Sequence, residues 1–326
     1  MELLQTQNRH SIIVPQEEIV VGTNKAFIEA NTLEVSLSHL KTDCTIPVFS
    51  KDNECTISHQ EFIGTAYDCA KSIFSDYAVS MPEVRVSHIV KGRIPSAIGK
   101  PVKELKEHEK TIYYERMMFK IEIPDVYEMI NGNLVKLTLG GVRAYNQENL
   151  YSKKTFEKFK FFIGFQNMVC CNMCVTSDGY VGEMRVGSLE DLKKQILEAI
   201  GSYQMQYHLE SMKALTKHKL SERQFAQLIG RCRLYNYLPK KEKVEILPFL
   251  LNDGQINNVA RAYYEDDSFC REDNGDITLW NFFNLLTSSN KSSYIDTFLD
   301  RSLNAHEITQ ALSNSLNNRT SVWYLN

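Results

Sequence analysis

The strongest constraint on the fold is a long run of alternating apolar and polar residues between positions 111 and 165. In TIYYERMMFKIEIP the alternate residues from Met117 to Ile123 are apolar, and FEKFKFFIGF shows the same alternation. Asn131-Gly132-Asn133 lies between the strand-like segments and is typical of a tight hairpin turn. Because successive residues of a strand point to opposite faces, the pattern predicts an antiparallel β-meander with one apolar face. That core face includes Phe159, Phe161, Ile163 and Phe165.

Helical signals flank this region. Ser58-x-x-Glu61 is a capping box that predicts a helix from position 58, and Ser188-x-x-Asp191 predicts another from position 188. Beyond 188 the apolar residues recur every three or four positions, which indicates helices. Ser221 is expected to open one helix, Pro239 lies at the first turn of another, and Asn304-x-x-Glu307 predicts the start of the last.

Strands come first along the chain and helices follow, so the fold class is α+β, an antiparallel β-meander packed against helices with a helical C-terminal half. We expect an irregular N-terminal segment at 1–57, a capped helix and antiparallel sheet at 58–187, and a helical region packed on the sheet at 188–326. The three parts are expected to form one continuous domain.

Charge and hydropathy exclude several classes of protein. The chain has 37 basic and 40 acidic residues and a net charge of −3, so any attraction to nucleic acid must come from a local patch. No apolar run approaches the roughly 20 residues that span a bilayer, and MELLQTQNRH lacks the features of a signal peptide. We therefore expect a cytoplasmic protein that does not contact a membrane.

The eight cysteines show no regular framework. Cys171-x-x-Cys174 has the spacing of a zinc knuckle, and Cys55 with His59, or Cys44, would complete four ligands. A second close pair is missing, so we expect Cys170, Cys171 and Cys174 to be reduced thiols and the protein to hold no metal and no cofactor. No spacing of nucleophile, base or glycine-rich loop supports an enzyme.

A basic surface is the remaining candidate site. On the face of the predicted sheet opposite the core, bases and rings alternate and only Glu122 opposes them. Such a face can follow a phosphate backbone and stack bases, as single-strand binders do. The alternative is an ordinary solvated sheet face. The residues of this face are Tyr114, Arg116, Lys120, Lys136, Lys158 and Lys160, together with Phe162.

A second basic region extends from 213 to 243, with nine basic and two acidic residues, among them Arg231 and Arg233 beside Tyr235 and Tyr237. The segment 265–276 that follows holds six acidic residues and one arginine. Opposed patches of this kind can support self-association, neutralise each other within the fold or hold a partner protein. We expect a homo-oligomer.

Several segments carry a resemblance to a known family. SHIVKGRIPSAI, EKTIYYERMMFKIEIP and FIGFQNMVCCNMCVTSDGY resemble domain-of-unknown-function family 3871, whose members are associated with phages and mobile elements. GFQNMVCCNMCVTSDG and TLWNFFNLLTSSNKSSYIDTF are also similar to the larger family 932 of phage and plasmid proteins. Neither resemblance implies catalytic residues.

Together these features favour a mobile-element-associated binding protein. The leading hypothesis is single-stranded nucleic-acid binding or annealing in phage or plasmid replication or recombination. The alternative is a protein–protein interaction module that inhibits a host defence or regulatory complex.

Overall fold

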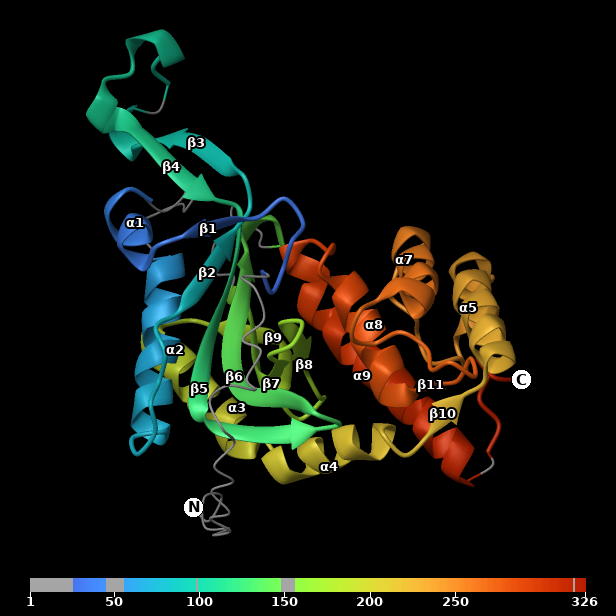
Figure 1. The fold of residues 1–326 in the computed structure, drawn as a ribbon. Coiled ribbons are helices and arrows are strands. Elements are labelled where there is room, and N and C mark those ends of the chain that lie inside the picture. The colour runs from blue at the N-terminus through green and yellow to red at the C-terminus, as the bar shows by residue number, and fades with distance from the viewer. Residues whose placement is uncertain (1–25, 45–55, 98, 148–155, 319) are drawn as a thin grey trace.

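A computed structural model describes residues 26–44, 56–97, 99–147, 156–318 and 320–326. At its centre lies a curled, seven-stranded antiparallel sheet with helices on both faces (Figure 1). The strand order is β1-β2-β5-β6-β7-β8, and β9 pairs with β7. Much of the predicted irregular segment 1–57 lies outside the described residues. The strands are β1 (Leu33–Val35), β2 (Glu83–Val86), β5 (Arg116–Ile130), β6 (Asn133–Ala144), β7 (Glu157–Asn167), β8 (Asn172–Cys174) and β9 (Tyr180–Val186).

The predicted hairpin turn is confirmed between β5 and β6. Ile130 pairs with Asn133, and the two residues between them, Asn131 and Gly132, have φ angles of 49° and 77°. Two consecutive left-handed residues define the turn that matches the twist of a β-hairpin, and asparagine and glycine adopt them at the lowest cost. The sequence of this turn therefore sets the pairing of β5 and β6 as far as Tyr127, beyond which an irregularity shifts the register.

The first face of the sheet carries the predicted core. Phe159, Phe161, Ile163 and Phe165 are buried there, under α2 (His59–Ile73), α3 (Leu189–Ser202) and α4 (Met205–Leu215). Both predicted caps are present: Ser58 and Glu61 form the capping box of α2, and the Ser188 side chain accepts from the Asp191 N–H. The α+β class predicted from the sequence is confirmed.

The second face of the sheet is also covered. Here α9 (Ile295–Asn318) lies against the strands and α8 (Leu279–Asn290) packs beside it. Phe162 of β7 belongs to a second buried apolar cluster with Phe298 of α9. The predicted start of the last helix at Asn304 is wrong, because α9 begins nine residues earlier at Ile295. Asn304 lies within the helix, where its side chain accepts from the Leu250 N–H at 2.9 Å and donates to the Pro248 carbonyl at 2.7 Å.

The remaining helices pack beside α8 and α9. Ser221 forms a capping box with Gln224 at the start of α5, as expected, and Pro239 is the N-cap of the short α6. No helix in the described ranges is both long and apolar enough to cross a membrane. The elements of this part are β10 (Lys219–Leu220), α5 (Glu222–Tyr237), α6 (Lys240–Lys243), α7 (Asp253–Glu265) and β11 (Ile277–Thr278). The short helix α1 (Leu37–Thr42) lies on the opposite side of the molecule.

A two-stranded ribbon projects from the sheet. It consists of β3 (Ile89–Arg93) and β4 (Lys110–Tyr114), joined by three short 3₁₀ turns, and extends well clear of the helices (Figure 1). Val86 pairs with Met117 and Ile89 pairs with Tyr114, so the register of β2 and β5 continues unchanged into the ribbon. The neighbouring pairs stop earlier, at Leu33–Val86 on one side and Arg116–Ala144 on the other. The ribbon therefore projects because its sheet neighbours end.

Candidate nucleic-acid interface

The basic face predicted from the sequence is not a solvated surface. Met118, Val142 and Phe162 lie on it, and they pack with Phe298 and Leu299 of α9 in the second apolar cluster. The helix thus lies where the predicted nucleic-acid strand would have run. The reason is visible in the composition of the face, because its large apolar side chains need a partner as much as those of the first face do.

Lys120 is the clearest example of a predicted binding residue that is buried. Only 6% of this residue is exposed, and its ammonium lies 2.6 Å from Glu122, 3.0 Å from Glu83 and 2.9 Å from the side-chain oxygen of Gln166. Burial alone would lower the pKa of Lys120, but attraction by Glu122 and Glu83 outweighs it and the pKa is raised. The charge is held within the fold and is not available to a phosphate.

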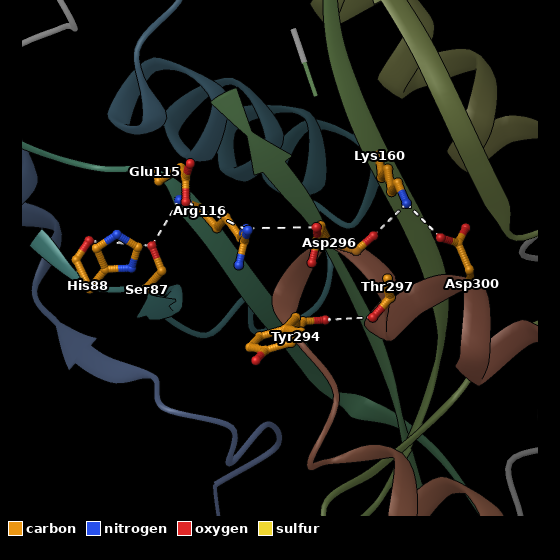
Figure 2. Close-up of polar contacts among 9 residues, drawn as sticks. All are labelled: Ser87, His88, Glu115, Arg116, Lys160, Tyr294, Asp296, Thr297 and Asp300. Atoms are coloured by element: carbon orange, nitrogen blue, oxygen red, sulfur yellow. Dashed lines mark hydrogen bonds and ion pairs between the residues drawn. The ribbon is translucent and has the colours of Figure 1, made fainter. Parts of the chain in front are cut away.

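Lys160 is held in a similar way by α9. Its ammonium donates to a carboxylate oxygen of Asp300 at 2.6 Å and to the main-chain carbonyl of Asp296 at 2.7 Å, as Figure 2 shows. Asp300 also accepts from the Tyr180 hydroxyl at 2.6 Å. Lys158, two residues before Lys160, is more open and lies 3.3 Å from Glu183. Lys136 is half-buried.

Tyr114 and Arg116 lie where the ribbon leaves the sheet. Tyr114 is 3% exposed, and its hydroxyl is 2.9 Å from Nε2 of His39, so its ring offers no stacking surface. The Arg116 guanidinium lies 3.7 Å from both Glu115 and Asp296. It also borders a cavity of about 190 Å³, lined by Asn31, Thr32, Ser87, His88, Arg116 and Tyr294.

The two arginines predicted from the helical region lie apart from this face, on α5. Arg231 packs over the Trp323 ring at 4.9 Å and donates to the carbonyl of Asn326, whereas Arg233 is exposed. The eight predicted binding residues therefore do not form one surface. The prediction that Arg116, Lys120 and Lys160 share a solvated face is wrong. Carboxylates of α9 lie against Arg116 and Lys160, and Lys120 is buried with Glu83 and Glu122 of the sheet.

The ribbon carries the exposed positive charge that the sheet face lacks. Residues 88–114 contain six basic and three acidic residues. Lys100 pairs with Glu109 and Lys110 with Glu107, and the ammonium of Lys100 lowers the pKa of Glu109. The exposed lysines without an ion pair among the described residues are Lys91, Lys103 and Lys106.

Sequence reasoning missed the ribbon. A signal was present, because the segment between Arg93 and Lys110 has neither helical nor strand periodicity and holds basic residues at 100, 103 and 106. The strand pattern runs on through Tyr114 and Arg116 without a break, however. The point at which β4 leaves the sheet is set by the length of neighbouring strands and not by its own residues.

With this geometry in place, the chain was compared with known proteins. A family model described as "Domain of unknown function, B. Theta Gene description (DUF3871)" matches residues 7–325. The chain belongs to the DUF3871 family. This confirms the family resemblance noted in the sequence. No curated protein and no solved structure matches the chain, so the chemistry of this DUF3871 protein has to be inferred from its own residues.

The cysteine cluster of this DUF3871 chain lies in the core. Cys170 and Cys174 are buried, and burial raises the pKa of Cys170 to about 12 and that of Cys174 further. Cys171, in the turn between β7 and β8, is half-buried. Cys55, one of the candidate metal ligands, lies outside the described residues. Within the described ranges no three histidine, cysteine or carboxylate side chains converge as metal ligands would.

Two buried histidines lie where α4 meets α9. The rings of His208 and His306 are 5.6 Å apart, with the Tyr203 hydroxyl 2.7 Å from Nδ1 of His208 and the Ser211 hydroxyl 3.0 Å from Nε2 of His306. Burial lowers the pKa of His306 to about 4, against an opposing pull from Asp178, and it lowers that of His208 as well. Both rings are thus neutral at pH 7 and help to fix α9 on the body of the protein.

Proposed function

We propose that this protein binds single-stranded nucleic acid through the β3–β4 ribbon and acts in the cytoplasm in phage or plasmid replication or recombination. The observation that carries the proposal is the ribbon itself, which projects from the body with Lys91, Lys103 and Lys106 exposed and without carboxylate partners in the described structure. Each phosphate that such a lysine contacts releases condensed counterions, which favours binding whatever the base sequence.

The positive charge of the ribbon matters because the rest of the molecule does not attract a polyanion. The net charge of the chain is −3, so long-range attraction to a polyanion must be concentrated where acids are few. Lysines on an exposed ribbon can alternatively serve to block edge-to-edge aggregation, and the experiment below separates the two roles.

The mobile-element context rests on the proposed similarity to family 932. Its two blocks, 164–179 and 278–298, are far apart in the sequence. In the fold, Asn167 and Asn172 of the first block donate to the side chain and the carbonyl of Asn284 in the second, both at 2.9 Å. Contact between the blocks supports the view that they form one buried unit common to both families.

The proposal is tested with a fluorescent single-stranded oligonucleotide titrated across a range of salt concentrations. Replacing Lys91, Lys103 and Lys106 together with alanine is expected to weaken binding at low salt and to reduce the salt slope by about 0.7 for each phosphate that is no longer bound. A matched control replaces Lys193, Lys194 and Lys217, three exposed lysines distant from the ribbon, and should leave the slope unchanged.

One result of this titration would contradict the proposal. If the unaltered protein binds no single strand even at low salt, where backbone electrostatics are strongest, the nucleic-acid proposal is wrong. The interaction module that inhibits a host defence or regulatory complex then takes its place.

Self-association is part of the same proposal. Arg233, Lys240 and Lys241 are exposed around the end of α5, whereas Asp267 and Asp273 are exposed near its start, about 24 Å away along a 16-residue helix. Lys219 and Glu272 of these two regions already pair within the chain at 2.7 Å, whereas the exposed charges at opposite ends of α5 are too far apart to pair in this way. They suit head-to-tail contact between copies, which produces rings or filaments.

Light scattering during size-exclusion chromatography tests this contact. Replacing Lys240 and Lys241 with glutamate should reduce the mass, and adding Asp267→Lys and Asp273→Lys should restore it. A monomeric unaltered protein at low salt would show that the patches do not bind each other.

A further inference from the structure

The cavity at the base of the ribbon is built from four separate parts of the chain. The turn at 30–32 forms one wall, Ser87 and His88 between β2 and β3 form another, and Arg116 of β5 and Tyr294 before α9 complete the lining. Figure 2 shows His88, Ser87, Arg116 and Tyr294 around this point. At about 190 Å³, the space corresponds to roughly six water molecules in the liquid. It is therefore large enough for one heteroaromatic ring and too small for a folded macromolecular segment.

The Arg116 side chain has guanidinium donors beside this cavity that make no hydrogen bond to the described residues. Its Nε is buried and faces Asp296 at 3.7 Å, as Figure 2 shows, and the terminal nitrogen nearest to Glu115 is also 3.7 Å from that carboxylate. The main-chain N–H of Arg116 already donates to the Ser87 hydroxyl at 3.1 Å. The terminal guanidinium nitrogens can therefore donate to a ligand acceptor placed in the cavity.

The charge around Arg116 selects the kind of acceptor. One guanidinium lies between two carboxylates, so the site gives no net attraction to a free phosphate or another small anion. A neutral group with a carbonyl or ring-nitrogen acceptor is not repelled by Glu115 and Asp296 and can accept a hydrogen bond from the Arg116 guanidinium. The edge of a nucleobase has these acceptors.

Tyr294 supplies a ring beside this donor. The residue is 62% exposed, and the Arg116 guanidinium lies 5.6 Å from its ring centroid. The main-chain carbonyl of Tyr294 accepts from the N–H and the hydroxyl of Thr297, at 3.1 and 3.2 Å, which fixes the residue at the start of α9. An aromatic ring on a fixed main chain, with much of its surface open to solvent, has the character of the stacking platforms that single-strand binders use.

We propose that this cavity takes one unpaired nucleobase, which stacks on Tyr294 and accepts a hydrogen bond from Arg116 while the ribbon holds the adjoining backbone. The inference rests on the proposed function and adds to it a recognition element for the base. It predicts that binding has two separable components: a salt-dependent one from the ribbon lysines and a salt-independent one from the cavity.

The experiment compares two single strands of equal length, one with bases and one composed of abasic units, in the same titration. Tyr294→Ala should weaken binding of the base-containing strand by about 5- to 150-fold, the range that stacking of one base supplies, with an unchanged salt slope and little effect on the abasic strand. Tyr294→Phe retains the ring and should bind like the unaltered protein. Tyr207→Ala removes a similarly exposed tyrosine from α4 and serves as the control.

The possible outcomes separate the two proposals. If Tyr294→Ala binds the base-containing strand as tightly as the unaltered protein does, while the ribbon variant still loses its salt slope, the cavity inference is wrong and the proposed function holds. If no strand binds the unaltered protein, both are wrong. A 2-aminopurine placed in the oligonucleotide gives an independent readout, since its fluorescence should be quenched on binding to the unaltered protein and not to Tyr294→Ala.

Discussion

The second face of the sheet and the β3–β4 ribbon are both rich in basic residues and differ in what surrounds them. On the sheet face, Lys120 is bonded to Glu83 and Glu122 of neighbouring strands and Lys160 to Asp300 of α9. On the ribbon, Lys91, Lys103 and Lys106 face solvent with no ion pair in the described part of the chain. The comparison shows that a strand pattern does not tell whether its lysines are exposed, because exposure depends on whether another element covers the strand.

The difference also separates two uses of charge. A lysine bonded within the fold contributes to the stability and specificity of packing, whereas an unpaired exposed lysine contributes little to stability and can attract a polyanion. The ranking of mutational effects on stability should therefore be the reverse of the ranking on binding.

The largest effect on stability is expected at Lys120. Lys120→Met keeps the length of the side chain and leaves Glu83 and Glu122 without their shared cation, which should lower the free energy of unfolding by about 3–5 kcal/mol. Urea denaturation measures the change. Adding Glu83→Gln and Glu122→Gln should recover part of the loss. A loss below about 0.5 kcal/mol, the size typical of surface sites, would mean that the lysine is not enclosed and would break the comparison.

Acidification should loosen the attachment of α9. The pKa of His306 is about 4 in the folded protein and about 6.5 when unfolded, so the unfolded state binds more protons between these values. Stability is therefore full above pH 6.5 and falls as the pH drops toward 4, by about 3 kcal/mol for this residue. His208, whose pKa is also lowered, adds in the same direction.

The measurement is the urea midpoint at several pH values between 7 and 4, for the unaltered protein and for His306→Gln. The variant should show a flatter profile, which separates this histidine from the titrating carboxylates. His88→Gln, at an exposed histidine of the ribbon base, should retain the original slope. Identical profiles for His306→Gln and the unaltered protein would contradict the buried neutral state.

Lys158 and Lys160 sharpen the comparison within one strand. Lys160→Met removes two hydrogen bonds to α9, including one to Asp300, and should cost about 2 kcal/mol. Lys158→Met removes a partly exposed pair with Glu183 and should change stability by less than about 0.5 kcal/mol. Equal losses of stability at the two positions, in the same urea assay, would show that the contacts of Lys160 with α9 add no stability.

The smallest effects on stability are expected on the ribbon. Lys91→Ala, Lys103→Ala and Lys106→Ala should each shift the free energy of unfolding by less than about 0.5 kcal/mol. A thermal denaturation series is sufficient to check this. A large destabilisation at any of the three would mean that these side chains have a structural role and would contradict the contrast between ribbon and sheet face.

The parts of the fold that follow local rules were predicted from the sequence. The hairpin at Asn131-Gly132 and the caps at Ser58, Ser188 and Ser221 depend on a few adjacent residues. The first face of the sheet follows from simple alternation, so its phenylalanines could be named in advance.

The candidate site could not be predicted in the same way, because it depends on contacts between distant segments. Met118 and Phe162 on the supposed polar face did signal that a second layer was needed, but not that α9 would supply it. Asn304 has the residue type and spacing of a helix cap, yet it holds the Pro248–Leu250 segment from within the helix. The cavity combines residues near 31, 87, 116 and 294, a combination that no local pattern specifies.

The unchanged register between the sheet and the ribbon has a consequence for how family members can diverge. Because Val86–Met117 and Ile89–Tyr114 belong to one ladder, adding two residues to each strand beyond Ile89 would lengthen the ribbon by about 7 Å without turning its faces over or disturbing the core. A single-residue insertion in one strand would instead exchange the two faces or force a bulge. The length of the ribbon can thus change in steps of two residues without any change to the core, so family members can differ in how far the ribbon extends from the same body.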